Sequence, residues 1–341
     1  MSAYPRTASS HADQRKPLTL PALAAMRARN EPIVMVTAYD YPSAQIAETA
    51  GVDLVLVGDS GAMTVLGYPS TVEVTVDEML ILTAAVRRGL RTPILVGDLP
   101  FGSYEISDAQ AVATAQRFVK ETGCAAVKFE GGHPEAVQRA RAMVRAGIPV
   151  MGHIGLTPQT ATALGGFKPQ GVTAQRASAI LEEALALQEA GCFAIVFEAI
   201  PTEVTEIIMT RLDVPVIGIG AGPATDGQVL VFHDLLGIYD GFKPKFAKRF
   251  ADVRRAMTDA MNAYAAEVRT GVFPGPEHCY HIPSGELAEF AEAAGLVPGD
   301  QGACNSPQHE DSTPSAAAKA PSSTAELQAE TTSTPDTLIG K

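Results

Sequence analysis

The strongest constraint on this chain is a short apolar segment that recurs along it and ends in polar residues. The clearest example, Leu54–Val57, is followed after one glycine by Asp59 and Ser60. An unbroken run of branched aliphatic residues is typical of a strand covered on both faces, as in a parallel sheet. Two later runs of the same kind lead to Asp98 and Glu130. Because parallel strands end at the same edge of a sheet, we expect these three acids to share one site.

Alanine-rich segments separate the apolar runs, so strand and helix are predicted to alternate along the chain. An eighth strand is expected near Phe242–Phe246, where Pro244 and basic residues make the pattern less regular. The seven clearer strands are predicted at Ile33–Thr37, Leu54–Val57, Ile94–Gly97, Ala126–Phe129, Pro149–Gly152, Phe193–Phe197 and Val214–Gly218.

This alternation leaves two architectures, a closed eight-stranded barrel and an open doubly wound sheet. Polar residues stand at the ends of many successive strands, whereas an open sheet gathers its ligands at a single switch point. Only closure brings so many strand ends around one mouth. We therefore predict an α/β fold of the (β/α)8 TIM barrel type.

Glycines and capping residues mark where the predicted helices begin and end. The segments Thr75–Glu78 and Ser107–Gln110 fit the capping-box pattern, in which side chains satisfy unpaired amides of the first helical turn. A glycine that can adopt positive φ is favoured just after a helix. The glycines predicted to end helices are Gly51, Gly89, Gly123, Gly147 and Gly191.

Composition divides the chain into three parts. Residues 1–17 lack periodicity and are expected to be a flexible arm, and residues 18–283 are assigned to the catalytic barrel. The barrel part ends in an amphipathic helix, Lys248–Val268, and a loop. Residues 284–341 are predicted to begin with a short helix, Ser284–Ala294, and to end in a low-complexity, disordered tail rich in Ser, Thr, Pro and Ala.

Charge and hydropathy exclude several classes of protein. A formal charge of -12, without a stripe of Lys and Arg, argues against nucleic-acid binding. No apolar run approaches the roughly 20 residues that span a bilayer, and the polar start lacks the apolar middle of a secretory signal, so a cytoplasmic enzyme is expected. Cys124 and Cys192 lack the spacing of a metal or disulfide framework and are predicted to be small buried residues.

The three acids Asp59, Asp98 and Glu130 are candidate metal ligands. Two carboxylates about 5 Å apart repel by roughly 3 kcal/mol at an effective dielectric of about 20, so a divalent cation or a raised pKa is needed to hold them together. Oxygen ligands without His or Cys nearby in sequence indicate Mg²⁺, and Mn²⁺ is the alternative. The competing interpretation is that each acid caps the helix that follows its strand.

Three further polar residues are placed near the same mouth. Lys128 leaves its strand on the same face as Glu130, where it either clamps a substrate carboxylate or forms an internal ion pair. Glu198 ends the sixth strand in an apolar setting that suits proton abstraction, although a metal ligand or a loop cap is the alternative. His153 either hydrogen-bonds a substrate oxygen, stands behind the residues that contact the metal, or is purely structural.

Five segments in this order closely resemble the motifs of the ketopantoate hydroxymethyltransferase family. The resemblance runs from about Leu18 to His278. The segments are Asp59–Gly67, Val96–Phe101, Val127–Gly132, Gly152–Gln159 and Ile217–Gly222.

The resemblance implies a (β/α)8 barrel that transfers a one-carbon hydroxymethyl unit from 5,10-methylenetetrahydrofolate to 3-methyl-2-oxobutanoate with Mg²⁺, giving 2-dehydropantoate for pantothenate and coenzyme A synthesis. It assigns Asp59, Asp98 and Glu130 to the metal. Asp59, Asp98, Ser60 and Lys128 resemble the residues that contact the oxoacid. The family also implies a homo-oligomer, often a decamer. Glu198 resembles the proton acceptor.

Two other functions remain open at this stage. One is a Mg²⁺-dependent barrel of the phosphoenolpyruvate mutase and isocitrate lyase type, which also binds oxoacid enolates at strand-end acids. The chain has no reactive-cysteine loop of the lyase kind, which disfavours that option. The other is a catalytically inert barrel that serves as a binding protein. The chain retains the three acids, Lys128 and Glu198, and this argues against an inert barrel.

Overall fold

Parallel strands, each hydrogen-bonded to its neighbours in chain order, close into an eight-stranded barrel in which β8 pairs with β1. The computed structural model describes residues 15–163, 165–241 and 244–296. The predicted TIM barrel is therefore confirmed. The strands are β1 (Ile33–Thr37), β2 (Leu54–Val57), β3 (Ile94–Asp98), β4 (Ala126–Lys128), β5 (Val150–Gly155), β6 (Ala194–Glu198), β7 (Val216–Ile219) and β8 (Gly227–Leu230).

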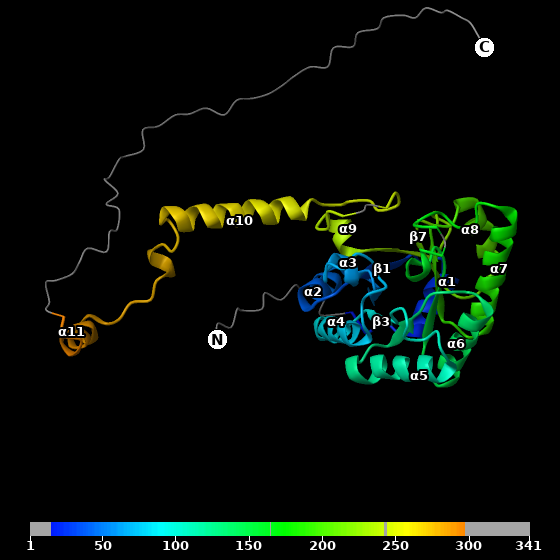
Figure 1. Cartoon of the computed structure of the whole chain (residues 1–341), viewed down its shortest axis with the longest axis horizontal. Coiled ribbons are helices and arrows are strands. Elements are labelled where there is room, and N and C mark those ends of the chain that lie inside the picture. Colours follow the sequence, from blue (N-terminus) through cyan, green and yellow to red (C-terminus); the bar gives the residue numbers. More distant parts are fainter. Residues whose placement is uncertain (1–14, 164, 242–243, 297–341) are drawn as a thin grey trace, which may run out of the picture. The chain divides into compact units, whose positions relative to one another are not determined.

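Helices follow most of the strands and cover the outside of the barrel (Figure 1). No helix in the described part of the chain is both long and apolar enough to cross a membrane. The α-helices are α1 (Leu20–Ala28), α2 (Tyr41–Ala50), α3 (Gly61–Thr64), α4 (Val76–Gly89), α5 (Asp108–Arg117), α6 (Pro134–Arg145), α7 (Ala174–Glu189), α8 (Thr202–Met209), α9 (Phe232–Leu236), α10 (Val253–Thr270) and α11 (Ser284–Ala293). The remaining helical turns are Phe118–Thr122, Pro158–Thr160 and Pro276–His278.

The seven clearer strand predictions are confirmed, with shifts at their ends, but the prediction of the eighth strand was wrong. Pro244–Phe246 forms a turn, and residues 242 and 243 lie outside the described residues. The strand is Gly227–Leu230 instead, which starts with glycine and carries an exposed Gln228, so it lacks the apolar pattern. Gly227 is required there because a Cβ atom would lie 2.4 Å from the carbonyl oxygen of Ile33 on β1.

Two apolar cores result from the alternation of side chains along each strand. On β2, Leu54 and Leu56 face the barrel interior, while Val55 and Val57 belong to the outer core between strands and helices. Leu23 of α1 also belongs to the interior cluster. The interior of the barrel is therefore filled with side chains.

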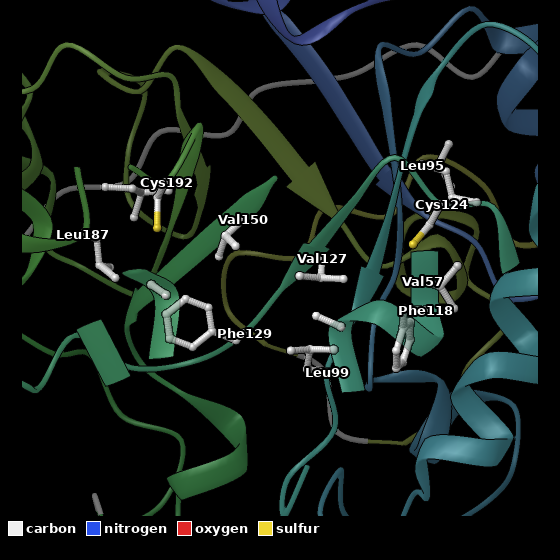
Figure 2. Packing of buried hydrophobic residues seen from close by; sticks show 14 of the residues in the cluster. Val57, Leu95, Leu99, Phe118, Cys124, Val127, Phe129, Val150, Leu187 and Cys192 are labelled. Atoms are coloured by element: carbon white, nitrogen blue, oxygen red, sulfur yellow. The ribbon is translucent and has the colours of Figure 1, made fainter. Parts of the chain in front are cut away.

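The outer core contains the two buried cysteines. Cys124 and Cys192 are free thiols with exposures of 3% and 2%, as the sequence predicted. Figure 2 shows both among the aliphatic and aromatic side chains of this core, including Phe118. Burial raises the pKa of the Cys192 thiol to about 12, which keeps the thiol protonated. Both cysteines are packing residues.

The helix boundaries agree with the sequence except at one glycine. Gly51 and Gly123 have φ angles of 75° and 73° just after their helices, and Thr75 forms the predicted capping box with Glu78. Gly89, by contrast, is the last residue of α4 and does not have a positive φ. It is small because α2 lies against it.

The predicted helix stops at Gly147 and Gly191 are confirmed, whereas the capping box predicted at Ser107–Gln110 is only half formed. Gly147 and Gly191 follow α6 and α7 with φ angles of 85° and 96°. Ser107 accepts a hydrogen bond from the Gln110 backbone at 3.1 Å, but the Gln110 side chain bonds Ile106 instead of closing the box. Ser107 is therefore an N-cap without the reciprocal contact.

The chain divides into two compact units, Met1–Thr270 and Gly271–Lys341. The barrel and α10 belong to the first unit, and α11 belongs to the second. Both predicted C-terminal helices are confirmed, although α10 begins later than expected. The arm at 1–14 and the tail from 297 lie outside the described residues, and the assignment of 18–283 to catalysis stays a prediction.

Replacing Gly89 by alanine is expected to destabilise the barrel. A Cβ atom at Gly89 would lie 2.6 Å from the Cβ of Ala44 and 2.8 Å from the carbonyl oxygen of Tyr41. This overpacking should lower the free energy of unfolding by about 1–3 kcal/mol, although alanine usually favours a helix. Urea unfolding followed by circular dichroism measures the change. Gly285→Ala, whose Cβ would meet nothing within 4 Å, is the control, and equal effects would contradict the packing argument.

Candidate active site

Strand alternation points a set of polar side chains into the carboxyl end of the barrel. On β3, Val96 fills the interior, and Asp98, two residues later, faces the same side at the end of the strand. Lys128, His153 and Glu198 hold the equivalent positions on β4, β5 and β6, each two residues after an interior apolar residue. The same periodicity that builds the core therefore builds the site.

One pocket contains every site residue that the sequence predicted. Its apolar walls suit an organic ligand and come from residues outside the strand ends, among them Met63, Phe167, Val231, Pro244 and Phe246. The predicted residues that line it are Asp59, Ser60, Asp98, Lys128, Glu130, His153 and Glu198.

Lys128 forms the internal ion pair that the sequence left as an alternative to a substrate clamp. Its Nζ lies 2.8 and 3.0 Å from the two carboxylate oxygens of Asp98 and 3.6 Å from Oε1 of Glu130. Burial opposes the charge, but these neighbouring carboxylates raise the pKa of Lys128, so the lysine stays protonated. A lysine only 4% exposed is therefore stabilised by the acids around it.

The three acids differ in how well their charges are compensated. Burial, together with the charges of Asp98 and Glu130, raises the pKa of Asp59 well above its usual value. Burial also raises the pKa of Asp98, although Lys128 partly offsets this effect. Burial acts in the same direction on Glu130, but Lys128 and His153 outweigh it and lower the pKa of this carboxyl. The charged form of the carboxyl is therefore least stabilised at Asp59, where the surrounding negative charge favours a cation.

His153 lies between two carboxylates. Its Nδ1 is 3.2 Å from Oε1 of Glu130, and its Nε2 is 3.3 Å from Oε2 of Glu198. The second contact is at ion-pair distance but does not have hydrogen-bond geometry, so Nε2 is a buried nitrogen without a hydrogen bond. Burial and Lys128 disfavour the charged ring, yet Glu130 and Glu198 raise the pKa of His153 to about 9.

Ser60 projects into the pocket beside a buried phenol. The hydroxyl groups of Ser60 and Tyr39 are 2.8 Å apart. Burial raises the pKa of Tyr39 to about 12, so the phenol remains protonated and shares a hydrogen bond with Ser60. The sequence predicted Ser60 as a site residue but gave no role to Tyr39, which lies two residues after β1.

The competing idea that the acids cap the following helices is wrong. The N-cap residues of α3, α5 and α6 are Ser60, Ser107 and His133. Asp98 instead accepts a hydrogen bond from the backbone of Asp59 at 3.1 Å, across the strand ends. Glu130 accepts one from the backbone of residue 159 in the loop after β5. The side chains of these acids therefore bond residues of neighbouring strands and loops and not the starts of their own helices.

The acids do not form a ready-made metal cage. Among the described residues, no group of three or more His, Cys, Asp or Glu side chains is arranged to hold an ion by itself. Asp98 is bonded to Lys128 through both oxygens, and Glu130 is bonded to His153. Asp59 keeps its Oδ1 atom free of hydrogen bonds with described residues. A cation that takes only one or two protein oxygens fits this arrangement better than one that needs a full protein shell.

Sequence reasoning gave no role to two buried residues that connect the acids. Gln159 follows β5 and bonds both Asp59 and Glu130, and Tyr104 bonds Gln159. Gln159 stands inside a motif that the sequence singled out, but a glutamine there has no local signal of burial. Tyr104 lies in a loop, and nothing in its neighbourhood predicts that it reaches the site.

Comparison with known proteins identifies the family. The sequence profile of ketopantoate hydroxymethyltransferase matches residues 17–276. The chain belongs to the ketopantoate hydroxymethyltransferase family. It is 54% identical over 267 residues to the 3-methyl-2-oxobutanoate hydroxymethyltransferase of Moorella thermoacetica, covering 78% of this chain and 99% of that one. The corresponding enzyme of Thermus thermophilus is 53% identical over 253 residues, covering 74% and 96%.

The family resemblance seen in the sequence is thus confirmed, and the chain is an enzyme of the hydroxymethyltransferase class. The family name connects it to pantothenate synthesis. Solved structures support the fold alone. The barrel resembles 2,3-dimethylmalate lyase, a phosphoenolpyruvate mutase and isocitrate lyase superfamily member, with a TM-score of 0.51 and 17% identity, covering 82% of this chain and 100% of that one. The barrel also resembles phosphonopyruvate hydrolase, with a TM-score of 0.51 and 15% sequence identity, covering 81% of this chain and 94% of that one.

Stability of the metal-free protein is expected to fall as the pH rises above about 6.5. The pKa of His153 is raised to about 9 in the folded state, whereas an unfolded histidine loses its proton near its ordinary pKa of about 6.5. The contribution of His153 to the free energy of unfolding, roughly 3 kcal/mol, is complete below pH about 6.5 and is lost as the pH rises to about 9. Urea unfolding in the presence of a chelator should therefore show that the free energy of unfolding falls more steeply with rising pH for the native protein than for His153→Gln. Identical pH profiles would contradict the assignment.

Proposed function

We propose that this enzyme transfers a hydroxymethyl group from 5,10-methylenetetrahydrofolate to 3-methyl-2-oxobutanoate and gives 2-dehydropantoate. The named activity of the relatives supports this reaction. The observation that carries it is the buried cluster in which Lys128 lies among Asp98, Glu130 and Asp59 at the mouth of the barrel. The acids of this cluster outnumber its lysine and so suit a divalent cation, while Lys128 is a fixed positive charge that stabilises negative charge developing on an oxoacid during the reaction.

Magnesium is the metal that we propose for this site, with one or two protein oxygens taken from among Asp59, Asp98 and Glu130. The ligands are hard oxygens, and the raised pKa values of Asp59 and Asp98 reflect negative charge that a cation would compensate. Magnesium usually takes one or two carboxylates and leaves other positions to water or substrate, which fits the free Oδ1 atom of Asp59. A phosphonopyruvate hydrolase of the same fold was solved with oxalate and Mg²⁺. When bound, the ion would act as a Lewis acid toward the oxoacid oxygens.

The chain's own residues would perform the proton transfer and the binding. Lys128 and Ser60 bind the oxoacid, and Lys128 stabilises the charge that builds as the C3 proton leaves. Glu198 accepts that proton, since it ends β6 at the pocket and has an oxygen 3.3 Å from the His153 ring. The enolate carbon then attacks the methylene carbon of the folate. A new carbon–carbon bond forms as one of the two carbon–nitrogen bonds of the methylene group breaks. Water then replaces the remaining folate nitrogen and supplies the hydroxyl group, and tetrahydrofolate leaves with the protons on its nitrogens.

The apolar walls of the pocket suit the remaining parts of both substrates. Met63 and Val231 offer a surface for the branched alkyl group of the oxoacid, and Phe167 and Phe246 offer one for a flat heterocycle. A homo-oligomer, such as a decamer, and a cytoplasmic location stay predictions. Relatives from rice and Arabidopsis are named mitochondrial enzymes, so location differs within the family.

Exchange of the C3 proton tests the first chemical step. The native protein with Mg²⁺ and 3-methyl-2-oxobutanoate in D₂O should replace C3–H by deuterium, because enolate formation does not require the folate. Proton NMR measures the exchange. Adding 5,10-methylenetetrahydrofolate should then convert the oxoacid to 2-dehydropantoate. Absence of exchange, with or without the folate, would rule out this mechanism, and exchange without product would point to another oxoacid-enolate enzyme.

Glu198→Gln is expected to abolish this exchange, because an amide cannot accept the proton, while oxoacid binding remains measurable. The loss should be at least about 100-fold, the lower end for a general base. Calorimetry reports binding, and NMR reports exchange. Glu203→Gln at the exposed start of α8 is the matched control. Retained exchange in Glu198→Gln would move the base to another residue.

Removal of single acids tests the metal site. Asp98→Ala and Glu130→Ala should each weaken Mg²⁺ binding by at least about tenfold, because each removes a carboxylate from the group that faces the ion. Isothermal titration calorimetry gives the affinity. Asp108→Ala, which removes an acid from the start of α5 outside the pocket, is the control. Unchanged affinity in both site variants would limit these acids to structural roles.

A further inference from the structure

Gln159 lies at the centre of the buried polar network below the pocket. It is 4% exposed and sits in the helical turn Pro158–Thr160, directly after β5. Its side-chain Nε2 is 3.0 Å from Oδ2 of Asp59 and 3.0 Å from the carbonyl oxygen of Leu99. Its backbone N–H donates to Oε2 of Glu130 at 3.0 Å. One residue from the β5 loop therefore contacts acids from β2 and β4.

The orientation of the Gln159 amide is determined by its partners. The Nε2 atom carries two hydrogens and meets two acceptors, so both hydrogens are used. The Oε1 atom accepts the hydroxyl hydrogen of Tyr104 at 2.6 Å. A flipped amide would place its oxygen against a carboxylate and a carbonyl. The amide therefore has one stable orientation, and Tyr104 helps to hold it.

Tyr104 is itself fixed from two sides. Its hydroxyl is 3.3 Å from the backbone nitrogen of Glu130, which donates to it, and its ring meets Phe129 edge-on with centroids 5.7 Å apart. Burial, followed by the charge of Glu130, raises the pKa of Tyr104 well above its usual value, so the hydroxyl retains the hydrogen it donates. A directed chain of hydrogen bonds thus runs from the β4 backbone through Tyr104 and Gln159 to Asp59.

The orientation of Asp59 depends on these hydrogen bonds from neutral groups, whereas the other two acids are held by charged side chains. Asp98 is bonded to Lys128, and Glu130 is bonded to His153. Among the described residues, the side chain of Asp59 receives a hydrogen bond from Gln159 and from no cationic group. A neutral amide is thus what orients Asp59, whereas the side chains bonded to the other two acids are Lys128 and His153.

We infer that Gln159 and Tyr104 are positioning residues that hold Asp59 with Oδ1 directed toward the divalent cation of the reaction. This inference rests on the proposed function, because it assumes that Asp59 binds the ion. A neutral amide suits the task, since it fixes Oδ2 without competing for the negative charge that the ion requires. Partners of this kind orient metal-binding groups, and their removal usually weakens metal binding by about 10–100-fold. We expect a loss of about the same size here.

The test measures metal affinity in two variants. Gln159→Met keeps the length of the side chain but cannot donate to Asp59, and it should weaken Mn²⁺ binding, measured by electron paramagnetic resonance, by about 10–100-fold. Tyr104→Phe removes only the hydroxyl and should give a smaller loss in the same direction. It also keeps the inference testable if Gln159→Met does not fold, which circular dichroism detects. Tyr68→Phe, which removes a hydroxyl bonded to Glu78 on α4, should bind Mn²⁺ as the native protein does.

Metal dependence separates positioning from general damage. Deuterium exchange by both variants should recover as the Mg²⁺ concentration increases, because the ion can restore the orientation of Asp59 by mass action. A merely structural defect would lower exchange at every Mg²⁺ concentration. Native protein that binds no Mn²⁺ would overturn the proposed metal site and this inference with it. Native protein that binds Mn²⁺, with unchanged affinity in both variants, would overturn the positioning role alone.

Discussion

The ion pair between Lys128 and Asp98 is the interaction on which the site depends. Both side chains are buried, and a carboxylate and an ammonium group reach such a place only as partners. The pair makes it possible for Glu130 and Asp59 to lie nearby, because Lys128 offsets part of their repulsion. The compensation is incomplete, as the raised pKa values of Asp98 and Asp59 indicate. The barrel mouth therefore retains an excess of negative charge that suits a cation.

A rigid barrel supports this charge cluster. Inward side chains alternate with outward ones, so the last inward residue of a strand faces the mouth while the residue below it packs the interior. The βα loops then add groups that no strand provides. Gln159 and Tyr104 come from such loops and link acids on different strands through neutral hydrogen bonds. The charged residues thus lie at the strand ends or just after them, and much of their orientation comes from the loops.

Most of the fold could be predicted from the sequence because local pattern and tertiary role agree in most elements. The seven apolar strands and the glycine at 51 have both the local sequence pattern and the tertiary role that this pattern predicts. The exceptions have a common cause. Gly227 and Gly89 are glycine because another segment's backbone approaches them, at Ile33 and at Tyr41. A close approach between distant segments leaves no periodic signal, so the eighth strand was misplaced and Gly89 was misread as a helix stop.

For the site, the sequence by itself determined which charged residues gather at the mouth, because a strand of period two fixes the face of each side chain. It predicted Asp59, Asp98 and Glu130 as one group of acids and as ligands for Mg²⁺ from their residue type and their position at the strand ends. Only the tertiary structure decided that Lys128 pairs with Asp98 and that Gln159 orients Asp59. Hydrogen bonds and ion pairs depend on distances of about 3 Å between atoms far apart in the chain, and no local pattern specifies such distances.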